Sequence, residues 1–580
     1  MKKKRFKNPS KNSSKNILKN PSSPKEDQEK VFLEYNIPLQ FPEKVLKELD
    51  QIPDAVKEEH FQNRKDLRDK NFVTIDGPTA KDFDDAIFVE KQDFGYKLFV
   101  AIADVSHYIK KGSALDQEAY SRGNSTYFPN CCIPMLPEKL SNDLCSLNPL
   151  QNRLVVVAEL DHDFKGNLLD YKIYPSVIQS QKRLTYKEVE DAIDQKNNLE
   201  NLEFLKEAKD LATILLQQHY KEGALNLDIP ETTIVIDEAN DVIDFKKETR
   251  LFSHQMIEQF MLAANKAVSL FLEKNNYFFM YRVHENPKQE KLQQLEIFSK
   301  TLGHLKPLNS RSNIIEFLKK FKGHPKSPIL NKLILRSLSQ ARYSAYNKGH
   351  YGLNFTSYTH FTSPIRRYCD LTIHRSIKAA LNKEKKSLLN EKEIEEQAVF
   401  ISEKEQNSVK AERQFMDIKK CRFLSLHIGK NFSGTVSSVT SFGIFISLND
   451  FDIEGLIRLK DLPGYWITDD VNLKIVSQRS KYTITFGDEV EIQVVNTNPE
   501  LGWIDFELLT HKGNPLPSSA KVKRNFSKQK FSKQKKSSRN SSDKKEKFSK
   551  RKKDKKGPPS KKNSASKKKK NNKNKKRFKY

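Results

Sequence analysis

Four aspartates crowd into the segment "TIDGPTAKDFDD", positions 74 to 85. Asp76 ends an apolar run just before the turn-forming pair Gly77-Pro78, and Asp82, Asp84 and Asp85 lead into a second strand-like run. Because side chains alternate along a strand, Asp82 and Asp84 are expected to point to one side, with Asp76 brought back beside them by the turn. Like charges this close repel and would otherwise bind protons, so the cluster requires a cation.

The ligand types in this cluster favour a hard metal ion. Carboxylate oxygens without histidine or cysteine are typical of magnesium, with manganese as the alternative, and magnesium combines few carboxylates with waters and substrate phosphate oxygens. Phosphodiester hydrolysis uses such a site, because the metal activates water and neutralises the leaving oxyanion. An acidic surface turn or a calcium loop is the competing interpretation. The calcium-loop spacing is not met, however, and Phe83 between two of the aspartates indicates a partly buried strand start.

A second motif supplies positive charge. The segment "YTHFTSPIRRYCDLTIHR" holds Arg366 and Arg367 just after Pro364, a residue that can position a helix start. A guanidinium directed at a scissile phosphate would stabilise the charge that develops there. Taken alone, two arginines at a helix start are more often surface residues.

The elements that must position these motifs form a large mixed domain. Residues 31–59 are expected to be a linker, an extended entry followed by a charged helical stretch interrupted by Pro53. Short β-branched and aromatic runs then predict strands, and from about residue 186 a helical period dominates. One long helix has an apolar stripe of Met256, Ile257, Phe260, Met261 and Ala264. We therefore predict an α/β (α+β) domain over residues 60–420.

A smaller all-β domain is expected over residues 429–509. About five runs of alternating apolar and polar residues with regular glycines predict a closed Greek-key barrel of the OB-fold kind. Phe432, Phe442 and Phe445 lie in its first two strands. Aromatic residues on such a face can stack nucleic-acid bases, or they can simply fill the barrel core.

Charge divides the chain into a slightly acidic body and two basic ends. Of a net charge of +29, residues 511–580 carry 30 lysines and arginines against 3 acidic residues, and residues 1–30 carry 10 against 3. Segments so poor in aliphatic residues cannot offset chain entropy by burial, so residues 1–30 and 510–580 are expected to be disordered polycations. They are interpreted as arms that bind nucleic acid through counterion release, with a solubility tail as the alternative.

Cysteine usage and hydropathy indicate a cytoplasmic protein. The five cysteines form no C-x-x-C pair, which favours a reducing compartment and argues against a zinc site. The basic start is not followed by an apolar signal-peptide segment, and no run is long enough to span a bilayer.

Taken together, the motifs closely resemble the ribonuclease II and ribonuclease R family of exoribonucleases over about residues 35–509. The segments that carry the resemblance occur in the family's order: "VTIDGPTAKDFDDAI", "IADVSHYI", "GNSTYFPNCCIPMLPEKLSNDLCSL", "SHQMIEQFMLAANKAV", "YRVHENP" and "GHYGLNFTSYTHFTSPIRRYCDL". The resemblance implies an RNB catalytic domain followed by an RNA-binding OB fold of the type named after ribosomal protein S-one. It also implies a processive 3′-to-5′ exoribonuclease that threads single-stranded RNA into a channel and releases nucleoside 5′-monophosphates.

The resemblance further assigns roles to single residues. Asp76, Asp82, Asp84 and Asp85 match the family's catalytic, magnesium-binding aspartates, and Arg366 matches the arginine that assists at the scissile phosphate. The residues matched to RNA contacts are Tyr127, which would stack the terminal base, Tyr186 and Glu258 near the 3′-terminal nucleotides, and Arg367 beside Arg366. As alternatives, Tyr127 and Tyr186 could be core tyrosines, and Glu258 could pair with His254 on its own helix.

Two departures from the family pattern stand out. The second base-clamping aromatic is matched by Leu227, whose aliphatic side chain can pack on a base but has no π-face. Full-length relatives also carry two cold-shock-type domains before the catalytic domain, where only a short basic leader is expected here. The lysine-rich tail is similar to that of ribonuclease R and would compensate by charge.

Three functional hypotheses follow. The first is an active, monomeric exoribonuclease of RNA turnover and quality control, acting on single-stranded 3′ ends, with structured RNA and ribosomes as further candidate partners and no membrane partner. The second is a noncatalytic RNA-binding or ribosome-binding protein with the same fold. The third is cleavage of single-stranded DNA, which only contacts to the 2′-OH would exclude.

Overall fold

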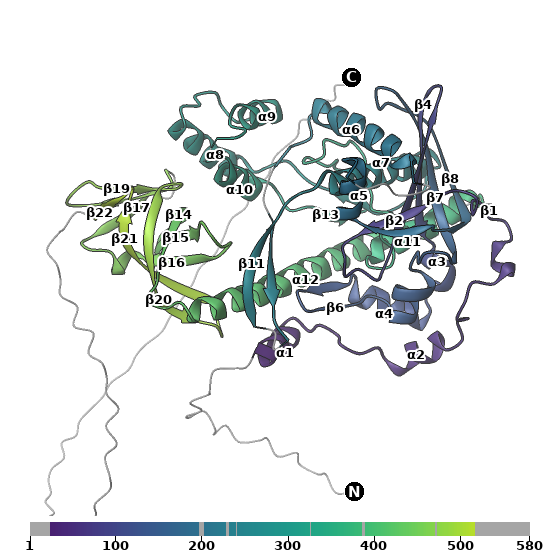
Figure 1. Ribbon diagram of the computed structural model, residues 1–580, viewed down its shortest axis with the longest axis horizontal. Helices are drawn as coiled ribbons and strands as arrows, with labels where there is room; N and C mark the ends of the chain where they lie inside the picture. The colour runs from purple at the N-terminus through teal and green to yellow at the C-terminus, as the bar shows by residue number, and fades with distance from the viewer. Residues whose placement is uncertain are drawn as a thin grey trace, which may run out of the picture. The chain divides into compact units, whose positions relative to one another are not determined.

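A computed structural model of the chain describes residues 24–196, 202–227, 231–238, 241–324, 326–384, 389–469 and 472–516 (Figure 1). The disorder predicted for the basic ends therefore falls largely outside the described residues. Within these ranges no helix combines the length and the apolar character needed to cross a membrane.

A seven-stranded mixed sheet lies at the centre of the larger domain. Its order is β1-β8-β7-β4-β3-β2-β9. The strands are β1 (Lys65–Asp66), β2 (Val73–Asp76), β3 (Asp85–Gln92), β4 (Gly95–Ala103), β7 (Asn152–Asp163), β8 (Leu168–Gln179) and β9 (Lys182–Thr185). Neighbours pair antiparallel except β1 with β8 and β2 with β9. The central strands β4 and β7 are buried along most of their length, because their apolar residues fill both faces.

Helices α6 (Phe204–Glu222) and α7 (Phe252–Lys274) pack against this sheet, with α5 (Tyr186–Ile193) beside them (Figure 1). On α7 the predicted apolar stripe is confirmed: Met256, Ile257, Phe260 and Ala264 are buried, and Met261 packs partly buried against the same core. The stripe fixes the rotation of α7, and with it the direction in which its polar residues point.

The remaining elements of this domain surround the sheet. They are α1 (Pro24–Glu34), α2 (Glu43–Leu49), α3 (Val105–Tyr108), α4 (Ala114–Arg122), β5 (Thr126–Phe128), β6 (Cys131–Ile133), β10 (Glu231–Ile236), β11 (Val242–Glu248), β12 (Tyr281–Val283), α8 (Gln289–Thr301), α9 (Arg311–Lys320), α10 (Ser327–Ser337), β13 (Arg342–Ser344), α11 (Tyr368–Leu381) and α12 (Glu391–Ser425). Single-turn 3₁₀ and π segments lie at Glu58–Phe61 and Lys139–Leu144.

Helix α1 corrects the prediction that residues 1–30 are disordered. It begins at Pro24, inside that range. Val31 is fully buried in a cluster with Phe415 and Ile418 of α12, so the helix has an apolar face that the basic composition of the leader concealed. Within the predicted linker, residues 31–59, the helical segments are the end of α1, the whole of α2 and the start of the short 3₁₀ turn.

The smaller domain is the predicted closed barrel. Its strands β14 (Asn431–Thr440), β15 (Gly443–Leu448), β16 (Glu454–Arg458), β20 (Glu489–Asn498) and β21 (Trp503–His511) are joined by β22 (Asn514–Pro515). A parallel pairing of β16 with β21 closes it, and there a Cβ on Gly455 would lie 2.3 Å from the ring of Phe506. Beyond the five strands predicted, β17 (Trp466–Asp469), β18 (Lys474–Ser477) and β19 (Thr483–Thr485) form a small sheet. Strands β21 and β22 also run past the predicted boundary at residue 509.

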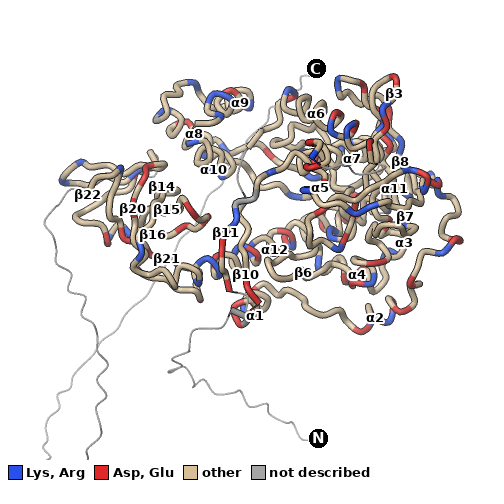
Figure 2. Tube along the Cα trace, viewed as in Figure 1, with Lys and Arg blue, Asp and Glu red and all other residues tan. Residues whose placement is uncertain are grey.

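Charges of both signs are interspersed over the described residues (Figure 2). This distribution agrees with the slightly acidic body inferred from the sequence, in which the excess of lysine belongs to the ends of the chain.

Candidate active site

The four aspartates meet where β2 ends and β3 begins. Asp76 is the last residue of β2, Asp85 is the first of β3, and the other two lie in the loop between them. Asp84 is 4% exposed, whereas the other three are half-buried. The loop is held in place by Phe83, whose side chain is buried and whose backbone N–H donates to Ser146 Oγ at 3.0 Å. The predicted convergence of the four carboxylates is thus produced by two neighbouring strands and one pinned loop.

Burial and mutual repulsion act on these carboxyls in the same direction. Burial, and then the charge of Asp82, raise the pKa of Asp76 to about 6, and burial, and then the charge of Asp76, raise the pKa of Asp85 to about 7. Burial raises the pKa of Asp84 well above its usual range, although Arg366 and the hydrogen bond from Ile365 oppose this shift. Without a cation the cluster therefore favours protonated carboxyls.

The oxygens of the site are of the kind that a magnesium ion uses. Among the described residues, Oδ2 of Asp76 and Oδ2 of Asp84 are buried and accept no hydrogen bond, and Oδ2 of Asp84 lies 3.4 Å from Nε of Arg366. No group of three or more His, Cys, Asp or Glu side chains in the described ranges is placed so that it could hold a metal ion. Such an arrangement would suit an ion that takes one or two carboxylates and completes its shell with waters and phosphate oxygens.

The two arginines of the second motif have different surroundings. Arg366 is 43% exposed; its Nε lies 3.4 Å from Oδ2 of Asp84 and its Nη2 donates to Ser363 Oγ at 2.9 Å. Arg367 instead forms two hydrogen bonds, of 2.9 and 2.7 Å, with the fully buried carboxylate of Asp370. Arg366 therefore faces the aspartates with free donors, while Arg367 is engaged in holding the start of α11.

Backbone contacts join the arginine segment to the aspartates. The N–H of Ile365 donates to Asp84 Oδ1 at 2.8 Å, and the N–H of Ser125 donates to the carbonyl of Arg366 at 3.0 Å. Ser125 leads into β5, which carries Tyr127. The Tyr127 hydroxyl donates to Asp82 Oδ2 at 3.0 Å while the side chain remains 40% exposed. Three segments far apart in the sequence thus converge, and the core-tyrosine alternative for Tyr127 is wrong.

Tyr186 is the first residue of α5, and Glu258 lies in the second turn of the neighbouring helix α7. The ring of Tyr186 stacks on His254, with centroids 4.0 Å apart, and the charges of Asp85 and Asp76 add to burial in raising its pKa. Glu258 forms an ion pair with Arg250. The imidazole of His254, on the same helix as Glu258, stacks on Tyr186.

Leu227 does not join the residues around the aspartates. Its partly buried side chain packs against the apolar cluster that α8, α9 and α10 form, together with Leu225. The predicted base contact of Leu227 stays a prediction, and the structure adds that part of its apolar surface packs on a neighbouring helical cluster.

The three barrel phenylalanines differ in exposure. Phe442 is 56% exposed. Phe445 is half-buried, with its ring centroid 6.1 Å from that of Phe442. Phe432 packs partly buried against the barrel core, 6.0 Å from Phe451. Phe432 is therefore a packing residue, and Phe442 is the one that presents a free ring.

Sequence reasoning missed Arg183 and Cys132. The Arg183 Nη2 donates to the carbonyl of Gly77 at 2.5 Å, its buried Nε has no hydrogen-bond partner, and its charge lowers the pKa of Asp76. The sequence feature that could have indicated Arg183 is its place in "KRLTY", three residues before Tyr186. Cys132 is exposed and lies opposite Tyr127 in the β5–β6 hairpin.

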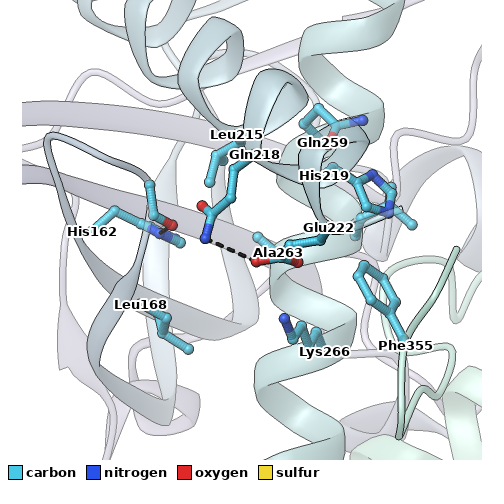
Figure 3. Close-up of a pocket in the computed structure, with 12 residues that line it drawn as sticks. His162, Leu168, Leu215, Gln218, His219, Glu222, Gln259, Ala263, Lys266 and Phe355 are labelled. Carbon is cyan, nitrogen blue, oxygen red and sulfur yellow. Dashed lines mark hydrogen bonds between the residues drawn. The ribbon is translucent and has the colours of Figure 1, made fainter. Parts of the chain in front are cut away.

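A separate cavity of about 90 Å³ lies between the β7–β8 turn and helices α6 and α7 (Figure 3). His162, Gln218, Glu222 and Lys266 line it. Asp85 on β3 pairs with Ile102 on β4, and Ile102 pairs with Val156 on β7. His162 follows six residues later on β7, so the cavity lies roughly 20 Å from the aspartates at the usual rise per strand residue. It is distinct from the site described above.

Comparison with known proteins agrees with this geometry. The family description "RNB domain" matches residues 64–383, and "S1 RNA binding domain" matches residues 425–508. Ribonuclease R of Thermotoga maritima is 37% identical over 511 residues, which cover 85% of this chain and 72% of that protein. Ribonuclease R 1 of Lactococcus lactis is 38% identical over 514 residues, covering 85% of this chain and 62% of that protein.

A solved structure gives the same result. Mycoplasma genitalium RNase R in complex with ribose-methylated single-stranded RNA superposes with a TM-score of 0.80 at 33% identity, covering 85% of this chain and 79% of that one. The matched regions contain the aspartate cluster, the arginine segment and the barrel. The chain therefore belongs to the ribonuclease R group of RNB-domain proteins, the 3′-to-5′ exoribonucleases that act on RNA.

Proposed function

We propose that this exoribonuclease is magnesium-dependent and processive, and that it releases nucleoside 5′-monophosphates from the 3′ end of RNA. The observation that carries the proposal is Asp84, a 4% exposed carboxylate near three other aspartates, whose Oδ2 accepts no hydrogen bond from the described residues and forms an ion pair with the exposed guanidinium of Arg366. Manganese is the alternative metal.

The orphaned oxygens of Asp76 and Asp84, with Asp82 and Asp85 beside them, would hold the metal. When bound, magnesium would polarise the scissile phosphate and lower the pKa of the attacking water. Arg366 would bind a nonbridging phosphate oxygen and offset the charge that develops on it, because its donors point toward the cluster and toward solvent. The Asp84 carboxylate orients that guanidinium, and Ile365 fixes the Asp84 carboxylate in turn.

Aromatic side chains would hold the 3′-terminal nucleotides in register. The exposed ring of Tyr127 is fixed through its hydroxyl to Asp82, so a base stacked on it lies next to the aspartates. Tyr186 is backed by His254, and Glu258 is an acceptor available to ribose hydroxyls through its exposed carboxylate. Contacts to the 2′-OH would exclude DNA.

The substrate range proposed includes structured RNA. The Mycoplasma genitalium relative has been solved with ribose-methylated single-stranded RNA and with double-stranded RNA. We propose the same two classes for this chain, with the exposed Phe442 on the barrel and the lysine-rich tail contributing affinity. A monomer acting in the cytoplasm on RNA turnover and quality control, with ribosomes as a further partner of the tail, completes the proposal.

The decisive assay follows end-labelled RNA with wild type and Asp84→Asn, each in magnesium or EDTA. We expect wild type to shorten 3′ ends stepwise to a short remnant and to release 5′-monophosphates. The variant and the chelated enzyme should retain RNA binding but lose cleavage by about a thousandfold or more, because the site loses a buried carboxylate or its metal.

The alternatives give different outcomes in the same assay. A wild type that binds RNA but is inert in magnesium would support a noncatalytic binding protein. Equal cleavage of single-stranded DNA would support a nuclease that does not recognise the 2′-OH. Cleavage that survives Asp84→Asn would contradict the assignment of the aspartates.

A further inference from the structure

Helix α1 contributes no residue to the aspartate cluster, yet it contacts the hairpin that carries Tyr127. The side-chain amide of Gln28 forms a reciprocal pair with Asn130 at the hairpin turn: Gln28 Nε2 donates to Asn130 Oδ1 at 3.0 Å, and Asn130 Nδ2 donates to Gln28 Oε1 at 2.8 Å. Gln28 Nε2 also lies 3.0 Å from Sγ of Cys131. Gln28 is only 8% exposed, so these contacts are shielded from water.

Apolar contacts hold the back of the same hairpin. Phe128 follows Tyr127 on β5 and points to the opposite side of the strand. Its ring packs edge-on against Phe32 of α1, with centroids 5.1 Å apart, and against Phe415 of α12, with centroids 5.5 Å apart. Val31 is fully buried in the same cluster. The hairpin is therefore wedged between two helices, and α1 forms one side of the wedge.

Helix α1 is itself anchored and cannot easily follow a shift of the hairpin. Asp27, 1% exposed, forms an ion pair with Arg422 near the end of α12. Just beyond the helix, the Tyr35 hydroxyl donates to Gln414 Oε1 at 2.6 Å. Both anchors lie on α12, so α1 and α12 act as one support for β5 and β6.

The front of the hairpin faces the site. Tyr127 donates to Asp82, and the strand start at Ser125 donates to the carbonyl of Arg366. A shift of the hairpin would therefore change the place of the exposed Tyr127 ring relative to Asp82. Misplacement by about 1 Å is enough to lower catalytic efficiency strongly.

We propose that Gln28 and Phe32 are positioning residues, through which α1 sets the place of Tyr127 and so the alignment of the 3′-terminal nucleotide. This inference rests on the proposed function, in which Tyr127 stacks the terminal base. It extends that function because it gives α1 a role in supporting the hairpin that carries Tyr127.

A double-mutant cycle tests the inference on the full chain. Gln28→Ala and Phe32→Ala should each lower kcat/KM for a short single-stranded RNA about threefold to tenfold, mainly by raising KM, because stacking binds the terminal base. In a Tyr127→Ala background the same substitutions should change kcat/KM by less than about twofold, because the ring that they position is gone. Leu33→Ala, at a 79% exposed position on α1, is the matched control.

A measurement without substrate separates this inference from the proposed function. Thiol labelling followed residue by residue should modify Cys131 several-fold faster in Gln28→Ala than in wild type or Leu33→Ala, because the hairpin turn loses its partner. Val45→Ala, a core change in α2, should lower the melting temperature without accelerating that labelling.

Each outcome decides the inference. The inference is overturned if Gln28→Ala and Phe32→Ala lower kcat/KM equally in the wild-type and Tyr127→Ala backgrounds. It is also overturned if Gln28→Ala leaves the labelling rate of Cys131 unchanged. If Tyr127→Ala keeps wild-type kinetics, the stacking role of Tyr127 is wrong. Faster Cys131 labelling in Gln28→Ala would then show that α1 supports the hairpin without a catalytic consequence. That result also overturns the positioning role.

Discussion

At the scale of single residues, Asp84 combines burial with repulsion from two neighbouring carboxylates, those of Asp82 and Asp85. Burial raises its pKa well above the usual range, and one salt bridge and one backbone hydrogen bond offset only part of this. At neutral pH the folded protein without metal must therefore either protonate this carboxyl or keep a buried charge, and both lower its stability. The proposed function, and not stability, accounts for this carboxylate.

This conflict predicts a metal-dependent stability. In EDTA at pH 8, Asp84→Asn should melt at least about 1 to 2 °C above wild type, because Asn removes a carboxyl whose raised pKa costs stability at this pH and keeps an acceptor for Ile365. Magnesium should raise the melting temperature of wild type more than that of the variant, since only an ion that binds the folded site stabilises it. Calorimetry with and without magnesium checks this, and an equal shift in both proteins would contradict it.

The two adjacent arginines predict opposite phenotypes. Arg366→Ala should lower kcat about a hundredfold or more with little loss of stability, because this 43% exposed guanidinium is proposed to offset charge in the transition state. Arg367→Ala should instead destabilise the fold by about 3 kcal/mol or more, because it leaves the buried Asp370 unpaired. Single-turnover kinetics and urea unfolding distinguish them. A folded, active Arg366→Ala would remove Arg366 from the site.

The residues that local sequence predicted are those whose neighbours lie close by in the chain. The aspartates share one turn and one loop, and Arg366 follows a proline at a helix start, so spacing alone brought out their chemistry. Arg183 was missed because its partner Gly77 is distant in sequence, and the stacking of His254 on Tyr186 was not foreseen for the same reason. Such contacts depend on strand order and on helix rotation, which periodicity does not specify.

At the scale of elements, the barrel separates a packing aromatic from an exposed one. Alternation along β14 and β15 predicted three candidate stacking residues, but His427, in the turn between α12 and the barrel, lies near Phe432. The loop residue Phe451 covers Phe432 further. The same helix explains why α1, in a basic leader, is ordered: its apolar face packs on α12. The packing around Phe432 and the packing of α1 on α12 both join residues that are distant in sequence, so neither can be predicted from the local pattern.

This difference gives a matched pair of substitutions. Phe442→Ala should weaken binding of single-stranded RNA about fivefold or more without changing the melting temperature, because an exposed ring stacks bases and packs little. Phe432→Ala should lower the free energy of unfolding by about 2 kcal/mol or more. Fluorescence anisotropy with a catalytically inert Asp84→Asn chain measures the affinity. Unchanged affinity in Phe442→Ala would place the base contacts elsewhere on the barrel.

At the scale of the whole molecule, charge is segregated along the chain. The described body mixes both signs (Figure 2), whereas residues 511–580 carry 30 lysines and arginines against 3 acidic residues. The structure also decides where the tail can be removed. His511 is buried in β21 and contacts Asp488 at 2.9 Å, and β22 ends at Pro515, so truncation must follow Leu516 if the barrel is to stay intact.

Removing residues 517–580 should lower RNA affinity and flatten its dependence on salt. Each phosphate neutralised contributes about 0.7 to the slope of log K against log salt for a single strand, so loss of several contacts should reduce the slope by several units. Degradation of a duplex with a 3′ overhang should fall more than that of an unstructured strand. A tail of equal length with glutamine in place of lysine is the control, because it keeps the chain and removes the charge. If both truncated and neutralised chains keep the wild-type slope, the tail serves solubility and the affinity must come from the folded body.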